Sequence, residues 1–222
     1  MKILLVEDDP ELADRLTKVL TESGFAVQHV SDGNEAVFVG QNYPVDAMVL
    51  DLGLPLLDGM SVLDRLRSEG ARFPVLVLTA RSRWSDKLSA FQAGADDYVT
   101  KPFQMDEVVV RLRALIRRST GHVSSTLSCG PLCMDTHDQR ITLRGETVSL
   151  TPHETRMLAY LLHHQDRVVS RTEIFDHVYD TDADRDSNVI DVLMARIRKK
   201  LGVPLIQTVR GAGYRLSSTE PL

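Results

Sequence analysis

Polar side chains stand directly after short apolar runs at four places in the first half of the chain. Glu7 and Asp8 follow one run, Asp51 ends a second, Thr79 ends a third, and Lys101 follows a fourth. Short apolar runs closed by Gly, Pro or charged residues predict buried strands. In an open α/β sheet the carboxyl ends of parallel strands meet at one edge, where ligands bind. We therefore expect these five side chains to share one pocket.

The chemistry of this expected pocket follows from its charges. Three carboxylates held close together repel one another, so either their pKa values shift or a cation lies among them. Oxygen ligands favour Mg²⁺, which takes one or two carboxylates together with phosphate oxygens, and Lys101 adds a compact positive charge suited to a phosphoryl oxygen. A carboxylate can also be the nucleophile in phosphoryl transfer. Each residue alone is more often a helix cap, a strand residue or a solvated charge, but together they predict that Asp51 accepts a phosphoryl group.

Hydrophobic periodicity predicts the elements that position this pocket. Five apolar segments alternate with five segments of helical periodicity, which predicts a doubly wound α/β fold with a five-stranded parallel sheet and helices on both faces. Asp9-Pro10 has the form of a helix cap followed by Pro at the first helical position. The predicted strands span 3–6, 25–30, 46–51, 74–79 and 97–100, and the predicted helices begin at Pro10, surround Ala36 and Val37, and span 59–67, 86–92 and 105–118.

The pattern changes after the last of these helices. Residues 119–126 are small and polar, and they predict a flexible linker between domains at 1–118 and 127–218. Short strands, three helices and a hairpin then predict an α+β winged helix-turn-helix domain. Thr151 and Ser170 each stand three residues before a Glu, which is the signature of a capping box. The predicted strands span 127–134, 139–143 and 147–150. One predicted helix begins after Thr151 and ends at Leu162, a second begins after Ser170 and ends at about Val178, and a third spans 187–201. The predicted hairpin spans 205–216.

Composition and charge limit the classes of protein to which the chain can belong. Its 222 residues, 43% hydrophobic and 26% charged, are typical of one or two globular domains. No apolar run approaches the roughly 18 residues that span a bilayer, and the first apolar run is too short for a signal peptide, so we expect a cytoplasmic protein without a membrane partner. The net charge is −5, but residues 185–215 carry seven bases and two acids, which predicts a focused anionic partner. Cys129 and Cys133 are interpreted as packed side chains rather than a metal or redox pair.

Residues 1–118 resemble the receiver domain of response regulators. The motifs that carry the resemblance are V-E-D-D, D-L-G-L-P-x-x-D-G, L-T-A-R and G-A-D-D-Y-V-T-K-P-F. The resemblance implies that a partner histidine kinase phosphorylates Asp51, that Thr79 and Lys101 bind the phosphoryl oxygens, and that Tyr98 fills the space that Thr79 vacates. The residues implied to organise Mg²⁺ are Glu7, Asp8, Asp51 and, through its backbone carbonyl, Gly53.

The same resemblance implies a homodimer that forms on activation through the fourth helix, the fifth strand and the fifth helix. Exposed ion pairs are individually weak, so such a dimer needs several of them together with an apolar patch. The residues expected at the charged contacts are Lys87, Asp96, Asp97, Glu107, Arg111 and Arg118, and those expected in the patch are Trp84, Phe91 and Val109.

Residues 127–218 resemble the winged-helix output domain of the OmpR/PhoB class. The matching motifs are L-T-P-H-E, V-V-S-R-T-E-I, N-V-I-D-V-L-M-A-R-I-R-K-K-L and T-V-R-G-A-G-Y-R. The resemblance implies that helix 187–201 enters a DNA major groove, that Arg210 reaches a minor groove, and that RNA polymerase touches the acidic loop 179–186. Arg196 is the candidate for a base edge, because Arg pairs bidentately with guanine. The expected DNA contacts are Asn188, Arg196, Arg198, Lys199, Lys200, Thr208 and Arg210, with Arg198, Lys199 and Lys200 assigned to phosphates.

Together these patterns predict a two-component transcriptional regulator, not an enzyme, that binds promoter direct repeats as a dimer. Two other classes are compatible with parts of the sequence. A Mg²⁺-dependent phosphohydrolase would also use Asp51, but such enzymes usually carry a second carboxylate two residues later, where this chain has Gly53; turnover of small phosphomonoesters would favour it. An architectural DNA-binding protein would bind its operator equally well with and without the substitution Asp51→Ala, and with and without a phosphodonor.

Overall fold

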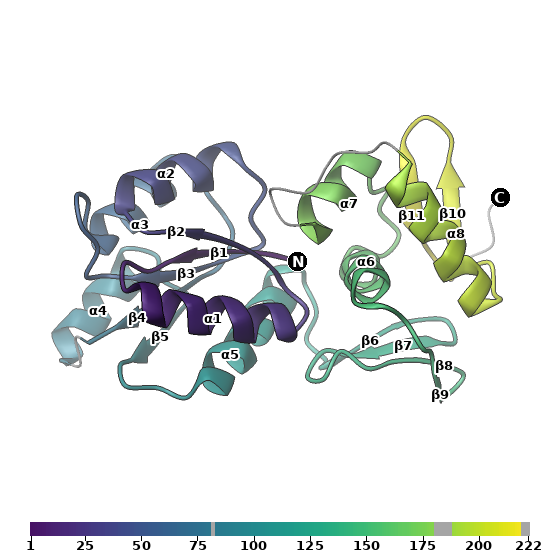
Figure 1. Cartoon of the computed structure of the whole chain (residues 1–222), viewed down its shortest axis with the longest axis horizontal. Helices are drawn as coiled ribbons and strands as arrows, with labels where there is room; N and C mark the ends of the chain where they lie inside the picture. Colours follow the sequence, from purple (N-terminus) through teal and green to yellow (C-terminus); the bar gives the residue numbers. More distant parts are fainter. Residues whose placement is uncertain (81–82, 180–187, 219–222) are drawn as a thin grey trace. The chain divides into compact units, whose positions relative to one another are not determined.

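The chain divides into two compact units (Figure 1). The computed structural model describes residues 1–80, 83–179 and 188–218. The first unit is Lys2–Ser119 and the second is Thr120–Leu222. Among the described residues, no helix combines the length and the apolar character that crossing a membrane requires.

A five-stranded sheet forms the centre of the first unit. Its strand order is β2-β1-β3-β4-β5, and every neighbouring pair is parallel, which confirms the predicted doubly wound fold. The strands are β1 (Lys2–Val6), β2 (Ala26–Val30), β3 (Ala47–Asp51), β4 (Val75–Thr79) and β5 (Asp97–Thr100), and the helices are α1 (Pro10–Glu22), α2 (Gly33–Asn42), α3 (Gly59–Ser68), α4 (Trp84–Gln92) and α5 (Met105–Ser119).

Successive side chains of these strands point to opposite faces of the sheet, because the strand period is two. Leu4 and Val6 of β1 and Val75 and Val77 of β4 belong to a buried cluster that also contains side chains of α2, α3 and α4. The intervening Leu5 is equally buried but lies outside that cluster. Figure 1 shows α2 and α3 on one side of the sheet and α1 and α5 on the other. Burial on both faces explains why the strands are continuous apolar runs in the sequence.

Aspartates cap three of the helices that follow the strands. Asp9, Asp32 and Asp58 each accept hydrogen bonds from two backbone N–H groups in the first turn, at 2.9 to 3.2 Å. Such a cap satisfies donors that have no partner within the helix. Pro10 is the first residue of α1, so the structure confirms the helix start predicted there.

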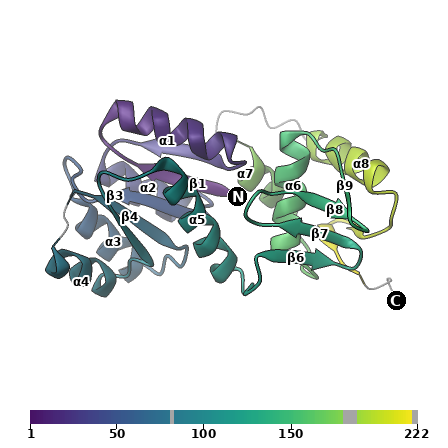
Figure 2. The same cartoon turned by 90° about the horizontal axis from the view of Figure 1, so that it is seen from below.

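In its described part, the second unit consists of a four-stranded antiparallel sheet, three helices and a hairpin (Figures 1 and 2). The sheet has the order β6-β7-β8-β9, and a bridge between Val169 and Tyr214 joins the hairpin to the segment before α7. The strands are β6 (Thr126–Cys129), β7 (Leu132–Asp135), β8 (Ile141–Leu143), β9 (Glu146–Thr147), β10 (Ile206–Val209) and β11 (Gly213–Leu216), and the helices are α6 (Pro152–His163), α7 (Arg171–Val178) and α8 (Val189–Leu201).

The structure corrects the single strand predicted over residues 127–134. That segment contains the end of β6, a turn, and most of β7, which pairs with β6 in the antiparallel sense. Gly130 stands in the turn at φ +57° and Pro131 follows it. Apolar residues recur on both sides of the turn, so periodicity alone suggested one strand, although Gly-Pro is itself a turn signal.

The two predicted capping boxes differ in the structure. At Thr151 both halves form, because its side chain caps α6 and the Glu side chain three residues later returns to its backbone N–H. Ser170 caps α7 by accepting from the backbone N–H of Glu173 at 3.0 Å. The Glu173 carboxylate instead accepts hydrogen bonds from Tyr160 and Arg167. Tertiary partners therefore replace the second half of that box.

The second unit begins directly after α5, and its first residues contact α6. Thr120 Oγ1 is 3.0 Å from His163 Nδ1, and His122 Nε2 donates to the His163 carbonyl oxygen at 3.2 Å. The predicted linker therefore has side-chain hydrogen bonds to α6 near its start. Its flexibility stays a prediction.

Candidate functional site

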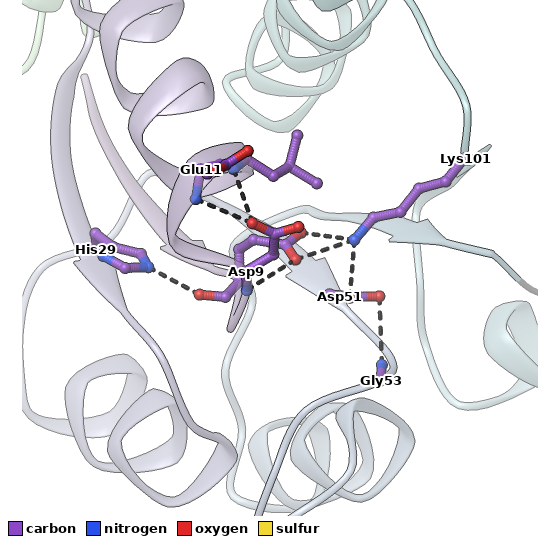
Figure 3. Close-up of polar contacts among 8 residues, drawn as sticks. Asp9, Glu11, His29, Asp51, Gly53 and Lys101 are labelled. Carbon is purple, nitrogen blue, oxygen red and sulfur yellow. Dashed lines mark hydrogen bonds and ion pairs between the residues drawn. The ribbon is translucent and has the colours of Figure 1, made fainter.

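The carboxyl ends of β1, β3 and β5 bring three of the predicted side chains into contact. Lys101 Nζ donates to both carboxylate oxygens of Glu7, at 3.0 and 2.8 Å, and to Oδ2 of Asp51 at 2.9 Å (Figure 3). Glu7 is 1% exposed and Asp51 is 8% exposed. Unpaired charges are costly at such burial, so the lysine makes it possible for two carboxylates to face one another at the sheet edge.

Of the two aspartates after β1, the structure brings Asp8 to the site and uses Asp9 as a helix cap. One oxygen each of Glu7, Asp8 and Asp51 lies within 4.8 Å of the other two. Mg²⁺ holds its oxygen ligands at about 2.1 Å, so two of them lie no more than roughly 4.2 Å apart. Small side-chain rotations would therefore let one ion bind all three carboxylates. The backbone N–H of Gly53 donates to Asp51 Oδ1 at 3.3 Å, which keeps the Gly53 backbone beside this all-oxygen donor set.

Burial and pairing act on the charges in opposite directions. Burial raises the pKa of the Glu7 carboxyl group above its ordinary value, and the hydrogen bond from Lys101 does not fully offset it. Burial also disfavours the Lys101 ammonium, but hydrogen bonds to Glu7 and Asp51 outweigh that effect and raise its pKa. Lys101 therefore remains a cation at neutral pH.

Thr79 ends β4, the strand beside that of Asp51, and Tyr98 lies on β5, the next strand outward. The backbone N–H of Lys101 donates to the Thr79 carbonyl oxygen at 2.8 Å, and Thr79 is 2% exposed. The Tyr98 side chain is also buried, and the Lys87 ammonium lies 5.6 Å from its ring centroid. A cation at this distance is attracted by the face of the ring, so α4 contacts β5 through Lys87.

Two residues near the acceptor were not predicted from the sequence. A Cβ on Gly59 would lie 2.3 Å from the carbonyl oxygen of Asp51, so only glycine lets α3 start this close to the end of β3. The D-G pair at 58–59 was the available signal. His29 Nε2 donates to the Glu7 carbonyl oxygen at 2.9 Å, and no feature of the sequence pointed to it.

Four of the six charged residues expected at a dimer contact, Asp96, Asp97, Glu107 and Arg111, form ion pairs within the chain. Arg67 pairs with Asp96 at 2.9 Å, and the same carboxylate accepts from the backbone N–H of Val75. Arg111 pairs with Asp97 at 2.8 Å and with Glu107 at 2.7 Å, and these hydrogen bonds raise the pKa of its guanidinium. Arg118 is exposed and donates to the carbonyl oxygen of Ala114.

The apolar residues expected in that contact differ in exposure. Trp84 is 77% exposed and Phe91 is 47% exposed, with Leu88 46% exposed between them on α4. Val109 is 6% exposed, because it lies on the inward side of α5, and Val110 is the exposed valine there. The structure therefore corrects Val109, which belongs to the core rather than to a surface patch.

Three of the cations expected to bind DNA are exposed. Arg196 and Lys199 lie on the outer side of α8, and Arg210 lies at the turn between β10 and β11. Among the described residues, no hydrogen bond or ion pair to another side chain is recorded for these three. Asn188, also exposed, is the residue before α8 and makes no side-chain cap there. The acidic loop expected to contact RNA polymerase lies, apart from Tyr179, outside the described residues.

Three other expected DNA contacts are engaged inside the second unit. Arg198 donates to the Ile206 carbonyl oxygen at 3.1 and 2.9 Å and to Thr208 Oγ1 at 2.7 Å. Lys200 Nζ donates to Glu154 Oε2 at 2.6 Å. Burial works against the Glu154 charge, but hydrogen bonds from Lys200 and from the cap of α6 outweigh it and lower its pKa. Arg198, Thr208 and Lys200 thus connect elements of the fold.

Family models match both units of the chain. Residues 3–113 match the response regulator receiver domain, and residues 145–216 match the C-terminal domain of transcriptional regulatory proteins. The two-component response regulator PhoP of Pseudomonas aeruginosa is 45% identical over 218 residues, which cover 96% of this chain and 97% of that protein. The chain is an OmpR/PhoB-class response regulator. It has the receiver and DNA-binding domains of a two-component transcriptional regulator.

Other relatives of this response regulator extend the likeness. The response regulator protein PmrA of Pseudomonas aeruginosa is 41% identical over 221 residues, which cover all of both chains. The transcriptional regulatory protein PhoP of Escherichia coli is 38% identical and covers 96% of this chain and 98% of its own. Among solved structures, the receiver domain of the Francisella response regulator 1452 has a TM-score of 0.52 and 35% identity, covering 53% of this chain and 98% of that one.

Proposed function

We propose that a sensor histidine kinase phosphorylates Asp51 and that the resulting charge activates the regulator for binding to promoter DNA. The single observation that carries the proposal is the contact of Lys101 with Asp51 and Glu7 at the end of β3, beside an oxygen of Asp8. A nucleophilic carboxylate beside one fixed cation and two further carboxylates suits phosphoryl transfer better than it suits structural pairing.

In the proposed reaction a carboxylate oxygen of Asp51 attacks the phosphorus of the kinase phosphohistidine. The O–P bond forms as the P–N bond breaks, and the imidazole nitrogen leaves with the electron pair and takes up a proton. Lys101 moves from the carboxylates to a phosphoryl oxygen, and Thr79 donates to another. Glu7, Asp8, Asp51 and the Gly53 carbonyl would hold Mg²⁺, which would supply positive charge beside the transferring group.

The acceptor is tested with acetyl phosphate and Mg²⁺, followed by intact-protein mass spectrometry. The wild-type chain is expected to gain one phosphoryl group, and Asp51→Asn to gain none. Asp64→Asn is the matched control, because Asp64 is an exposed carboxylate on α3 and its loss should leave labelling intact. A labelled Asp51→Asn chain would exclude Asp51 as the acceptor, and turnover of small phosphomonoesters would favour a phosphohydrolase.

The switch proposed for this receiver passes through Thr79, Tyr98 and α4. A phosphoryl group adds about −1.5 to −2 charge, which draws the Thr79 hydroxyl toward it. Tyr98 is buried on β5, which pairs with the strand of Thr79, and Lys87 lies over its ring, so the proposed route from the acceptor to α4 passes through this one aromatic side chain. We propose that the activated chains then pair through α4, β5 and α5, with Trp84 and Phe91 in the contact.

Existing ion pairs make that dimer less favourable, because they already engage Asp96, Asp97, Glu107 and Arg111. Each is satisfied within its own chain, so pairing between chains must share or exchange these bonds rather than satisfy unpaired charges. The exposed apolar side chains of α4 therefore supply most of the proposed attraction. Lys87 and Arg118 are the cations that remain for contacts between the chains.

We propose that α8 enters a major groove and that the wing, β10 and β11 with the turn between them, reaches a minor groove. Arg196 is the proposed base contact, Lys199 a phosphate contact and Arg210 the wing contact, which their exposure supports. Two such units in a dimer would occupy direct-repeat half-sites about one helical turn apart. A contact of the acidic loop with RNA polymerase is part of the same proposal.

A further inference from the structure

The ring of Tyr214 on β11 is contacted by cations from two helices. The guanidinium carbon of Arg171 on α7 lies 5.1 Å from the ring centroid, and that of Arg198 on α8 lies 5.4 Å from it. Tyr214 is 3% exposed. Cation–π attraction is stronger where water is excluded, so this one ring binds both helices to the wing.

The Tyr214 hydroxyl adds a second connection, to the first turn of α8. It donates to Asp191 Oδ1 at 2.6 Å, and Arg171 Nε donates to the same oxygen at 2.7 Å. The hydrogen bond from Arg171, followed by that from Tyr214, lowers the pKa of the Asp191 carboxyl group. Asp191 is therefore an ionised acceptor shared by α7 and the wing.

Arg198 extends the same network to the other strand of the wing. Its guanidinium donates to the Ile206 carbonyl oxygen and to Thr208 Oγ1, both on β10. α8 is thus held to β11 near its start, through Asp191, and to both strands near its end, through Arg198. Contacts near both ends of α8 restrict its tilt and its rotation relative to the wing.

The base of the wing is fixed to the segment that leads into α7. Val169 and Tyr214 exchange backbone hydrogen bonds of 2.8 Å in both directions. A Cβ on Gly213 would lie 2.0 Å from the Val169 carbonyl oxygen, and Gly213 has φ +139°. The absence of a side chain at Gly213 therefore allows the two backbones to approach closely, and it also allows the positive φ of the turn.

We infer that Tyr214, Asp191, Arg171 and Arg198 are positioning residues that hold α8 and the wing in one fixed relation for DNA recognition. The inference rests on the proposed reading of DNA by these two elements. Arg196 and Arg210, the proposed contacts, lie on the two elements that the network joins. Groups fixed beforehand lose less entropy on binding, so the network raises affinity for the site that both can contact together and adds no contact of its own.

A different role for Asp191 would be direct contact with a base, since a carboxylate can accept from the amino group of cytosine. Its Oδ1 already accepts two hydrogen bonds, which favours positioning over reading. The two roles predict different behaviour of Tyr214→Phe, because this substitution removes only the hydroxyl and leaves the ring beside both guanidinium groups.

The experiment uses the full chain with the DNA sequence that the wild-type protein selects from a random pool, and with a scrambled duplex. Tyr214→Phe is expected to weaken binding to the selected sequence about tenfold, the size of one lost hydrogen bond to a charged group. Affinity for the scrambled duplex and its salt dependence should stay close to those of the wild type, whereas the unfolding midpoint of the second unit should fall modestly, because the lost hydrogen bond also stabilises the folded unit. Arg210→Ala should reduce affinity for the selected sequence less in the Tyr214→Phe chain than in the wild-type chain, because the wing is no longer fixed relative to α8.

Three outcomes decide the inference. A Tyr214→Phe chain that binds the selected sequence as tightly as the wild type overturns it, and so does an equal loss on both duplexes. If Asp191→Asn changes the selected base at one position while Tyr214→Phe changes nothing, Asp191 reads a base and the positioning role is wrong. A wild-type chain that selects no sequence refutes the proposed DNA reading itself, which is a separate failure.

Discussion

At the scale of single residues, the structure separates side chains that the sequence presents as equivalent. Asp8 and Asp9 are adjacent carboxylates, yet Asp9 caps α1 and Asp8 offers an oxygen to the acceptor site. Arg198 and Lys199 are adjacent cations on α8, yet only Arg198 is bound to the wing. In both cases the two adjacent side chains point in different directions from the backbone and so meet different neighbours.

The glycines around Asp51 give a prediction about stability. Gly59→Ala should destabilise the receiver by about 1–3 kcal/mol, because its Cβ would lie 2.3 Å from the Asp51 carbonyl oxygen and the backbone must move. Gly53→Ala is the matched control, since its Cβ would meet only the Asp51 carboxylate at an ordinary 3.6 Å. Urea unfolding followed by circular dichroism measures both, and equal midpoints for the two variants would contradict the prediction.

The exposed cations of α8 give a second prediction. Arg196→Ala should lose about 1–3 kcal/mol on the selected DNA and relax the preference at one base pair, whereas Lys199→Ala should weaken all sequences and reduce the salt slope by about 1. Binding titrations over a range of salt concentrations, on the selected and scrambled duplexes, separate the two effects. If Arg196→Ala weakened both duplexes equally, it would be a phosphate contact.

At the scale of elements, ion pairs between distant segments hold the second unit together. Glu154 at the start of α6 is 1% exposed and accepts from Lys200 near the end of α8. The two residues are 46 positions apart, and the pair fixes the end of the proposed recognition helix against the core. A buried carboxylate without this partner would be costly.

The pair predicts a pH-dependent stability. The pKa of Glu154 is lowered in the folded chain, so its contribution is complete above the ordinary value of about 4.5 and is lost as the pH falls through the folded value. Lys200→Met should destabilise the second unit by about 1–2 kcal/mol at pH 7, a figure kept small because solvent screens the Lys200 side chain, which is 36% exposed.

Hydrogen exchange of α6 and α8, followed by mass spectrometry from pH 7 to pH 3, checks this pair. The difference between the wild-type chain and Lys200→Met should diminish toward the acidic end, as the Glu154 carboxylate becomes protonated. Lys199→Met is the control, because Lys199 is exposed on the same turn. A difference that stays constant over the whole range would show that the effect is not due to the Glu154 charge.

At the scale of the whole molecule, the function proposed here depends on two copies meeting. The surface of α4 carries Trp84, Leu88 and Phe91, all well exposed, while Asp96, Asp97, Glu107 and Arg111 are already paired within the chain. Association is therefore expected to depend on apolar contact more than on salt bridges, and to be less sensitive to salt than a purely electrostatic contact.

Activation should produce a dimer that Trp84→Lys weakens. With beryllofluoride and Mg²⁺ as a substitute for phosphorylation, sedimentation velocity is expected to show a wild-type dimer and at least a tenfold higher dissociation constant for the variant. Phe38→Lys on α2 is the control, since Phe38 is 56% exposed and lies outside the proposed contact of α4, β5 and α5. Equal loss in both variants would point to a non-specific apolar association.

Much of this protein was determined by local sequence. Apolar strands ending in carboxylates, a threonine and a lysine predicted the parallel sheet and the residues around Asp51, because strand period and caps are properties of neighbouring residues. Only the tertiary structure decided that Val109 is buried, that β6 and β7 are two strands, and that Arg198, Thr208 and Lys200 are bound within the fold. The hydrogen-bond partners of Arg198 and Lys200 lie 8 and 46 positions away along the chain, respectively. Such contacts depend on how distant elements pack, which periodicity does not encode.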